Sequence, residues 1–267
     1  AEQNIAQPSK LRFEGWHKSS FTALTRDFDT PLQAGNVELP DFIFDEPTIS
    51  DIAENVNFQL DFPRGARAGS FLHSFLERLK AEDFSSYDTL FSQLKSSLYP
   101  AQEAEEEKRT RQALRQWFET ITQSNLISGS SLAQIPLNRR ANEMKFVLGV
   151  NAQRPMPFDK INALFEEWGK NMRLKDQRSL IGFLRGEIDL CYEHEGRYYV
   201  LDYKSNHLGN KAQDYEQNAL ERAMDEHHYW LQALIYQTAL HRWLGKRLPD
   251  YQAQQHLGDV EYFFVRG

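Results

Sequence analysis

The chain has 267 residues, of which 40% are hydrophobic and 13% are aromatic, and its single cysteine excludes both an internal disulfide and an iron–sulfur cluster, which needs four cysteine ligands. This composition is typical of a soluble globular protein that forms one large domain, or one domain and an extension. No apolar run reaches the roughly 18 residues of a membrane span, and the N-terminus lacks the features of a signal peptide, so we expect a cytoplasmic location.

Five prolines break up residues 1–63, and no motif with chemical potential occurs among them. We therefore predict a linker or peripheral segment over residues 1–63 and a single domain over residues 64–267. Because the chain begins without a methionine and ends directly after an apolar, strand-like run, we expect it to be a segment of a longer protein.

A glycine-containing segment that begins at Arg64 leads into a predicted helix that ends near Leu79. Helical spacing places apolar residues in one stripe. These are Phe71, Leu72, Phe75, Leu76 and Leu79. Gly69, His73 and Glu77 lie on the opposite side at i, i+4 spacing, where a histidine is either exposed to solvent or part of a site.

Two further amphipathic helices are predicted over residues 86–98 and 103–123, separated by Pro100. Together they predict a helical cover over the entrance of a site. Residues 142–150 have the pattern of a strand, and residues 158–170 that of a helix with an apolar stripe. The stripe consists of Ile161, Leu164, Phe165 and Trp168.

Positive charge gathers between residues 170 and 186, although the net charge of the chain is −7. Five basic residues against one acidic residue give this stretch a local charge of +4. The overall charge has the wrong sign for attracting nucleic acid, so any phosphate contacts are expected in this stretch, with Arg185 as a candidate.

Residues 186–204 predict a β-hairpin, since two runs rich in β-branched and aromatic residues flank Glu195 and Gly196. A turn centred there places Asp189 directly across from Asp202, with about 5 Å between their Cβ atoms. Lys204 shares a strand face with Asp202, about 7 Å along the strand. Two carboxylates and one ammonium group therefore converge.

The second strand of this hairpin is otherwise apolar, and buried charge is costly unless it is offset. A divalent cation would offset two carboxylates, and carboxylate, water and phosphate oxygens describe a magnesium site used in phosphodiester chemistry. Lys204 would then polarise the attacking water or stabilise charge on the phosphate. The alternative is a surface hairpin with a solvated salt bridge.

Beyond the hairpin, residues 205–212 predict a polar loop where a nucleic-acid strand could lie, followed by helices over residues 213–224 and 225–244. The second helix is apolar around nearly its whole circumference, so it should be buried against a sheet. Gln232 and Tyr236 lie one turn apart within it, and their polar atoms need partners.

The predicted fold is α/β: a central mixed β-sheet, with strands near residues 143, 186, 197 and 259, flanked by helices and preceded by the helical N-terminal cover. No Gly-x-x-x-x-Gly-Lys-Ser/Thr phosphate loop occurs, so ATP-driven unwinding cannot reside in these residues.

The motifs Gly186-x-Ile-Asp189 and Asp202-Tyr-Lys204 resemble those of the PD-(D/E)XK nuclease superfamily. The longer run from Asp202 to Gly209 resembles the family of nuclease domains at the C-terminus of RecB, the beta subunit of exodeoxyribonuclease V. The resemblance covers at least residues 69–267 and, more loosely, the start of the chain. It implies a restriction-endonuclease-like sheet and hydrolysis of DNA with Mg²⁺, for which Ca²⁺ or Mn²⁺ can substitute.

In this resemblance His73, Asp189, Asp202 and the backbone carbonyl of Tyr203 are metal ligands, and Asp189, Asp202 and Lys204 are catalytic. Gly69-x-x-x-His73 is similar to the first motif of the family. Gln232-x-x-x-Tyr236 is similar to its last motif, whose side chains orient the active site and contact nucleic acid; a satisfied core pair is the alternative. Glu77 and Arg185 are weaker candidates for supporting roles. Glu143 is similar to an acidic position that assists the metal, although a strand-edge glutamate paired to Lys or Arg is the alternative.

The resemblance further implies a helicase–nuclease that works with RecC and RecD subunits on double-strand ends in recombinational DNA repair, with single-stranded DNA at this site. The rival hypothesis is a non-catalytic domain of the same fold that serves as a DNA-holding or subunit-docking platform. A serine or cysteine hydrolase is disfavoured, because no Gly-x-Ser-x-Gly motif occurs and Cys191 lies in a predicted strand with no obvious base beside it.

Overall fold

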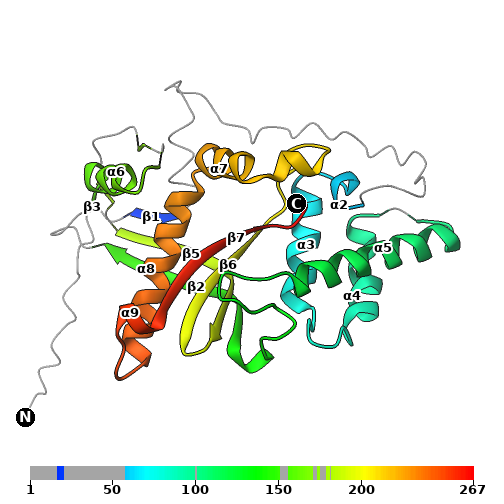
Figure 1. Ribbon diagram of the computed structural model, residues 1–267, viewed down its shortest axis with the longest axis horizontal. Coiled ribbons are helices and arrows are strands. Elements are labelled where there is room, and N and C mark those ends of the chain that lie inside the picture. Colours follow the sequence, from blue (N-terminus) through cyan, green and yellow to red (C-terminus); the bar gives the residue numbers. More distant parts are fainter. Residues whose placement is uncertain are drawn as a thin grey trace, which may run out of the picture. The chain divides into compact units, whose positions relative to one another are not determined.

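The computed structural model describes residues 17–20, 58–99, 101–150, 156–170, 173–174, 179–180 and 182–267 (Figure 1). The chain divides into two compact units, one formed by residues 1–30 and 147–186 and the other by residues 31–146 and 187–267. The larger unit contains the hairpin and every predicted site residue except Arg185. The domain boundary between residues 63 and 64 stays a prediction.

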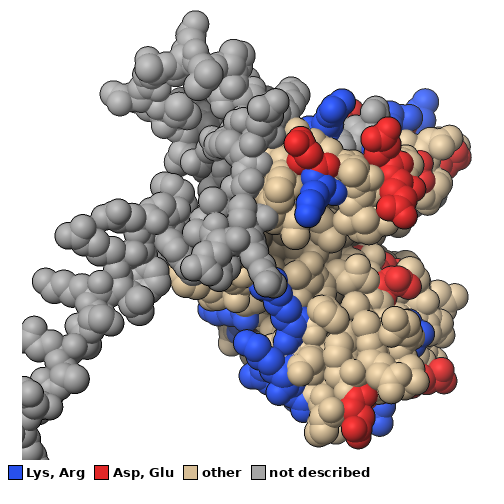
Figure 2. Space-filling model, turned by 90° about the vertical axis from the view of Figure 1, so that its left-hand side faces the viewer, with Lys and Arg blue, Asp and Glu red and all other residues tan. Residues whose placement is uncertain are grey.

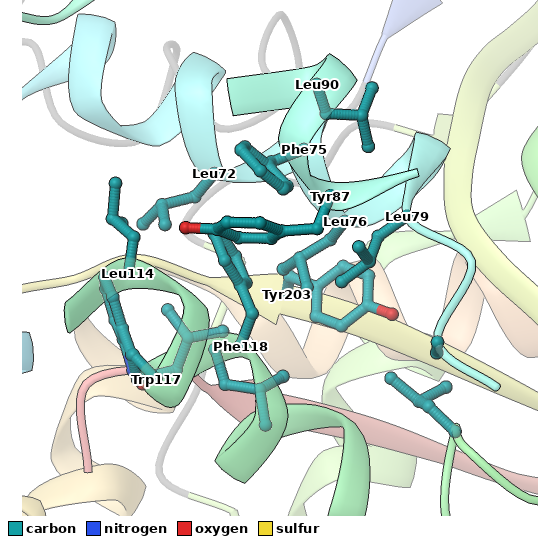
Figure 3. Packing of buried hydrophobic residues seen from close by; sticks show 14 of the residues in the cluster. Leu72, Phe75, Leu76, Leu79, Tyr87, Leu90, Leu114, Trp117, Phe118 and Tyr203 are labelled. Carbon is teal, nitrogen blue, oxygen red and sulfur yellow. The ribbon is translucent and has the colours of Figure 1, made fainter. Parts of the chain in front are cut away.

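The first part of the larger unit is helical, as the apolar spacing predicted. Its helices are α2 (Phe58–Asp61), α3 (Ala66–Arg78), α4 (Tyr87–Leu94) and α5 (Ala104–Gln123), with short 3-10 turns at Lys95–Ser97 and Leu137–Arg139. All five residues of the predicted stripe are buried, four on α3 and Leu79 directly after it. They pack with α4 and α5 into an aromatic core, in which the rings of Phe75 and Phe118 stack at 4.4 Å (Figure 3).

Four predicted strands are confirmed as one mixed sheet. They are β2 (Arg140–Val150), β5 (Gly182–His194), β6 (Arg197–Lys204) and β7 (Leu257–Phe264). Strand β5 pairs with β2 and antiparallel with β6, and β6 pairs in parallel with β7. Both β2 and β5 continue into the smaller unit.

The hairpin between β5 and β6 has the predicted turn. Glu195 and Gly196 both have positive φ, 50° and 80°, which is what a two-residue turn of the primed type requires. The ladder runs from His194 opposite Arg197 to Leu190 opposite Leu201. Asp189 and Asp202 are therefore the next residues along this register.

Helices from the C-terminal part cover the sheet. They are a 3-10 turn (Ala212–Tyr215), α7 (Gln217–Glu226), α8 (Tyr229–Arg247) and α9 (Ala253–His256). As predicted, α8 packs against the sheet, on β6 and β7. The break between α7 and α8 lies near residue 228 rather than at 224, because His228 adopts a left-handed conformation with φ 56°.

The smaller unit contains a strand that the sequence did not predict, β1 (His17–Ser20), parallel to the first part of β5. It also contains β3 (Met156–Pro157) paired with β4 (Ser179–Leu180), and α6 (Phe158–Glu167). The predicted helix ends at Glu167 rather than at residue 170, since Gly169 has φ 66°, and Trp168 beyond its end is 45% exposed instead of buried in the stripe.

Two of the five basic residues of the predicted stretch, Lys175 and Arg178, lie outside the described residues. On the face drawn in Figure 2, Lys and Arg side chains gather along one edge, so the net charge of −7 does not describe every part of the surface. None of the helices in the described residues combines the length and the hydropathy that a membrane crossing requires.

Arg266 joins the C-terminal end of the larger unit to the residues around α2. Its side chain is only 1% exposed, and the guanidinium lies over the ring of Phe62 at 5.4 Å. It donates hydrogen bonds to four backbone carbonyls, those of Ser205, Gln59, Phe62 and Pro63. These bonds join the loop after β6 to the segment around α2, so one charged side chain satisfies several buried acceptors.

We predict that Arg266→Met lowers the free energy of unfolding by at least about 2 kcal/mol, because four carbonyls lose their donors and the apolar replacement supplies none. Urea unfolding of both proteins measures this difference. Arg109→Met, at an exposed position on α5, is the matched control and should change stability by less than about 0.5 kcal/mol. Similar losses in the two variants would contradict the role of Arg266.

Candidate active site

Asp202 sits at the centre of the site. It follows the apolar part of β6, and its neighbour Tyr203 points into the helical core (Figure 3), so Asp202 and Lys204 face the opposite side of the strand. The Asp202 side chain is 3% exposed. Burial raises its pKa to about 6, and the negative charge of Asp189 acts in the same direction against the opposing charge of Lys204.

Asp189 reaches the same place from β5. Beyond the last ladder pair, its Oδ2 accepts a hydrogen bond from the backbone N–H of Tyr203 at 2.8 Å. The carboxylate thus bonds the neighbouring strand directly at the point where the register of the hairpin places it across from Asp202. The convergence of the two carboxylates, predicted from the hairpin turn, has this structural basis.

Lys204 is held by its polar neighbours. Its Nζ lies 2.6 Å from Oδ2 of Asp202 and donates a hydrogen bond to Oε1 of Gln232 at 2.9 Å. The ion pair lacks hydrogen-bond geometry, so this Asp202 oxygen accepts no hydrogen bond from the described residues. Gln232 in turn donates to the hydroxyl of Tyr236 at 3.0 Å. The two α8 residues are therefore satisfied in the core and also linked to the lysine.

Two tyrosines that sequence reasoning missed enclose the ammonium group. Nζ of Lys204 lies 3.8 Å from the ring centroid of Tyr229 and 5.0 Å from that of Tyr262, within the range of cation–π attraction. The hydroxyl of Tyr262 donates to Oε1 of Gln232 at 3.1 Å. Tyr229 lies three residues before Gln232 on the same helix face, which is a usable sequence signal. The position of Tyr262 follows from the parallel pairing of β6 with β7.

His73 approaches from α3. Its Nδ1 lies 3.3 Å from Oδ2 of Asp189, and its side chain is 35% exposed. Burial lowers the pKa of His73, but the hydrogen bond to Asp189 and the charges of Asp189 and Asp202 outweigh this, so the pKa is raised overall. The structure thus brings together the glycine-preceded histidine and the hairpin carboxylates.

Glu143 adds further negative charge from β2, where its φ is 50°. Burial raises its pKa to about 7, and nearby negative charges act in the same direction. These belong to Asp189, Glu187 and Glu77. Within the described residues Glu143 forms no ion pair with Lys or Arg. Glu77 is exposed near this group, whereas Arg185 belongs to the smaller unit, so its role stays a prediction.

The donor set fits a divalent cation. No three His, Cys, Asp or Glu side chains of the described residues form a ready-made metal site. However, Oδ2 of Asp202 is buried and accepts no hydrogen bond from the described residues, and burial raises the pKa values of Asp202 and Glu143, with neighbouring carboxylates acting in the same direction. Carboxylate oxygens with one imidazole suit Mg²⁺ or Mn²⁺. The ligand roles themselves stay predictions.

Comparison with known sequences finds a family and relatives that agree with one another. A sequence profile of the PD-(D/E)XK nuclease superfamily matches residues 52–266. RecBCD enzyme subunit RecB of Escherichia coli (strain K12) is 33% identical over 273 residues, which cover 100% of this chain and 22% of that protein. The RecB subunit of Haemophilus influenzae is 33% identical over 80% of this chain and 17% of its own length. That of Mycobacterium tuberculosis (strain H37Rv) is 51% identical over 33% of this chain and 8% of its own length. The chain thus spans about a fifth or less of these curated relatives.

The raised pKa of Asp202 predicts how stability depends on pH without metal. The fold favours the protonated carboxyl, so this contribution is complete below pH 4 and is lost as pH rises through about 6. Asp202→Asn should remove this loss, which is on the order of 3 kcal/mol. Urea unfolding with a chelator at several pH values tests this. Asp250→Asn, at an exposed position, is the control; an Asp202→Asn profile parallel to the wild type would refute the prediction.

Proposed function

The chain belongs to the PD-(D/E)XK nuclease superfamily, and from this premise we propose that it is a Mg²⁺-dependent deoxyribonuclease that hydrolyses phosphodiester bonds in single-stranded DNA. The observation that carries the proposal is the meeting of Asp189, Asp202 and Lys204 at one end of the hairpin, with His73 beside them. A salt bridge with only a structural role would not explain why negative charge exceeds positive charge at this place.

Asp189, Asp202, His73 and the backbone carbonyl of Tyr203 would hold the metal ion. When bound, a divalent ion lowers the pKa of a water ligand and offsets charge on the scissile phosphate. Glu143, whose pKa near 7 reflects burial and the surrounding carboxylates, would support the same ion, directly or through water. A bound cation would favour the charged forms of Asp202 and Glu143, whose pKa values burial raises.

Lys204 would orient the attacking water or the phosphate. An ammonium group has three N–H donors. Asp202 and Gln232 occupy two directions around Nζ, and the tyrosine rings close others, so the remaining N–H is confined to a narrow range. Gln232 and Tyr236 therefore act as positioning residues, since they hold Lys204 rather than the substrate.

We further propose that the chain is the nuclease domain of a larger helicase–nuclease of the RecBCD type. The relatives named above are RecB subunits, and the chain matches 22% of the length of the Escherichia coli protein. In that assignment the full protein works with RecC and RecD subunits on double-strand ends during recombinational DNA repair. Unwinding and strand feeding then belong to other parts, so the isolated chain should cut slowly and without processivity.

The activity test is cleavage of an end-labelled DNA single strand by the chain with and without Mg²⁺. We expect slow, Mg²⁺-dependent cleavage, and rates at least about 100-fold lower for Asp202→Ala and Lys204→Ala, since each removes charge stabilisation at the phosphate. Asp259→Ala, at an exposed position, is the matched control. Equal rates in wild type and Asp202→Ala would rule out the assigned site.

Calorimetric titration with Ca²⁺ or Mg²⁺ separates a metal-dependent nuclease from the platform alternative, because a platform need not bind metal. We expect wild type and Lys204→Ala to bind Ca²⁺ and Asp202→Ala to bind at least about tenfold more weakly, because Asp202, unlike Lys204, supplies a ligand oxygen. A wild-type chain that binds neither Ca²⁺ nor Mg²⁺ would favour a non-catalytic platform.

The aromatic enclosure of Lys204 makes a separate prediction. Tyr229→Leu removes the ring under the ammonium and should lower kcat about tenfold, with KM and Ca²⁺ affinity nearly unchanged, because the ring touches neither substrate nor metal. Tyr229→Phe keeps the ring and should stay within about threefold of wild type. Single-turnover cleavage measures both. Equal losses in the two variants would show that the hydroxyl, not the ring, matters.

A further inference from the structure

The loop that follows Lys204 is fixed on several sides. The backbone carbonyl of Ser205 accepts from Arg266 at 3.0 Å, and the side chain of Asn206 accepts from the Tyr229 hydroxyl at 3.2 Å. The N–H of Leu208 donates to the hydroxyl of Tyr215 at 3.2 Å. A Cβ at Gly209 would lie 2.0 Å from Oδ2 of Asp214, so the loop also needs glycine there to pack closely. The side chains that this loop presents are therefore held in place.

Asn210 accepts two hydrogen bonds at one atom. Its Oδ1 lies 2.9 Å from Nη2 of Arg64 and 2.9 Å from Nε2 of His207. Because this oxygen accepts from Arg64, the bond with His207 requires the hydrogen on Nε2. The amide nitrogen of Asn210 and the other guanidinium nitrogens of Arg64 have no hydrogen-bond partner among the described residues. The surface here therefore offers several hydrogen-bond donors that have no partner among the described residues.

Positive charges act on His207, which bonds Asn210. Arg64 forms no ion pair with a carboxylate of the described residues, and the first turn of α3 contains no acidic residue. Burial lowers the pKa of His207, and the charges of Arg64 and Arg266 lower it further, so the imidazole is neutral at pH 7. A neutral His207 has one N–H, on Nε2, and donates it to Oδ1 of Asn210. Such a surplus of donors and positive charge matches an anion.

This surface adjoins the candidate active site. A Cβ at Gly69 would lie 3.1 Å from Oγ of Ser205, which directly follows Lys204, so the loop and the first turns of α3 touch. Eight helical steps separate Gly65 from His73, about 12 Å at the rise of an α-helix. A nucleic-acid strand covers such a distance within a few nucleotides.

We propose that Arg64 and Asn210 bind a backbone phosphate of the nucleic-acid strand, a few nucleotides from the scissile phosphate, and that His207 is the positioning residue that holds Asn210 for this contact. This proposal rests on the proposed function, since it assigns the substrate of the same site. The contact is to the backbone, so it is independent of base sequence.

The test is fluorescence anisotropy of a labelled DNA single strand of about 12 nucleotides, titrated with the full chain at several salt concentrations. A chelator is present, so that binding is measured without cleavage. Arg64→Gln should weaken binding and reduce the slope of log affinity against log salt by about 0.7, the value for one phosphate contact on a single strand. Arg109→Gln, which removes an exposed charge on α5, should leave the slope as in wild type.

Asn210→Asp gives the sharper variant. The new carboxylate would pair with Arg64 and repel phosphate, so we expect affinity to fall at least about tenfold, beyond the effect of Arg64→Gln. Asn125→Asp, at an exposed position, adds the same charge elsewhere and is the matched control. Thermal unfolding of all variants checks that they are folded.

An Arg64→Gln slope equal to that of wild type, or Asn210→Asp binding equal to that of Asn125→Asp, would overturn the proposal. So would a wild-type chain that does not bind the strand at low salt. The proposed function fails by a different result, namely absence of Mg²⁺-dependent cleavage while the Arg64 effect on the salt slope persists.

Discussion

The structure depends on one unfavourable interaction, the burial of Asp202 beside Asp189. Two carboxylates at the end of a hairpin repel each other, and a side chain that is 3% exposed cannot rely on water for relief. Lys204 at 2.6 Å offsets part of this charge, but the raised pKa of Asp202 shows that the offset is incomplete. The fold must therefore supply stability elsewhere to keep these groups together. This is the arrangement expected where a bound cation completes the charge balance.

Elements far apart in the sequence meet around this interaction. The antiparallel register of β5 and β6 sets the distance between the two carboxylates, and the parallel pairing of β6 with β7 places Tyr262 opposite Asp202. Helix α8 contributes Gln232 and Tyr229, while α3 brings His73 to Asp189. Since each group is held by a separate strand or helix, the arrangement has little freedom to relax, and the charge remains concentrated.

What the sequence could predict is what short-range geometry controls. A two-residue turn at Glu195 and Gly196 determines the register of β5 and β6, so the meeting of Asp189 and Asp202 followed from local spacing. The enclosure of Lys204 by Tyr262 did not, because it depends on which strands are neighbours across a long connection. Strand β1 was missed for the same reason, and the end of α7 was misplaced because a left-handed His228 is not typical of that residue.

The stability that supports the buried charge comes from the opposite face of β6. Tyr203 lies in the aromatic core of α3, α4 and α5, so the strand cannot rotate to expose Asp202 without removing a large ring from that core. Arg266 adds a second constraint, since its bond to the Ser205 carbonyl fixes the chain one residue after Lys204. Side chains alternate between the two faces of β6, so the residues that pack in the apolar core on one face fix the positions of the charged residues on the other. Weaker packing of this core should therefore first disturb the relative positions of the two carboxylates, before the domain unfolds.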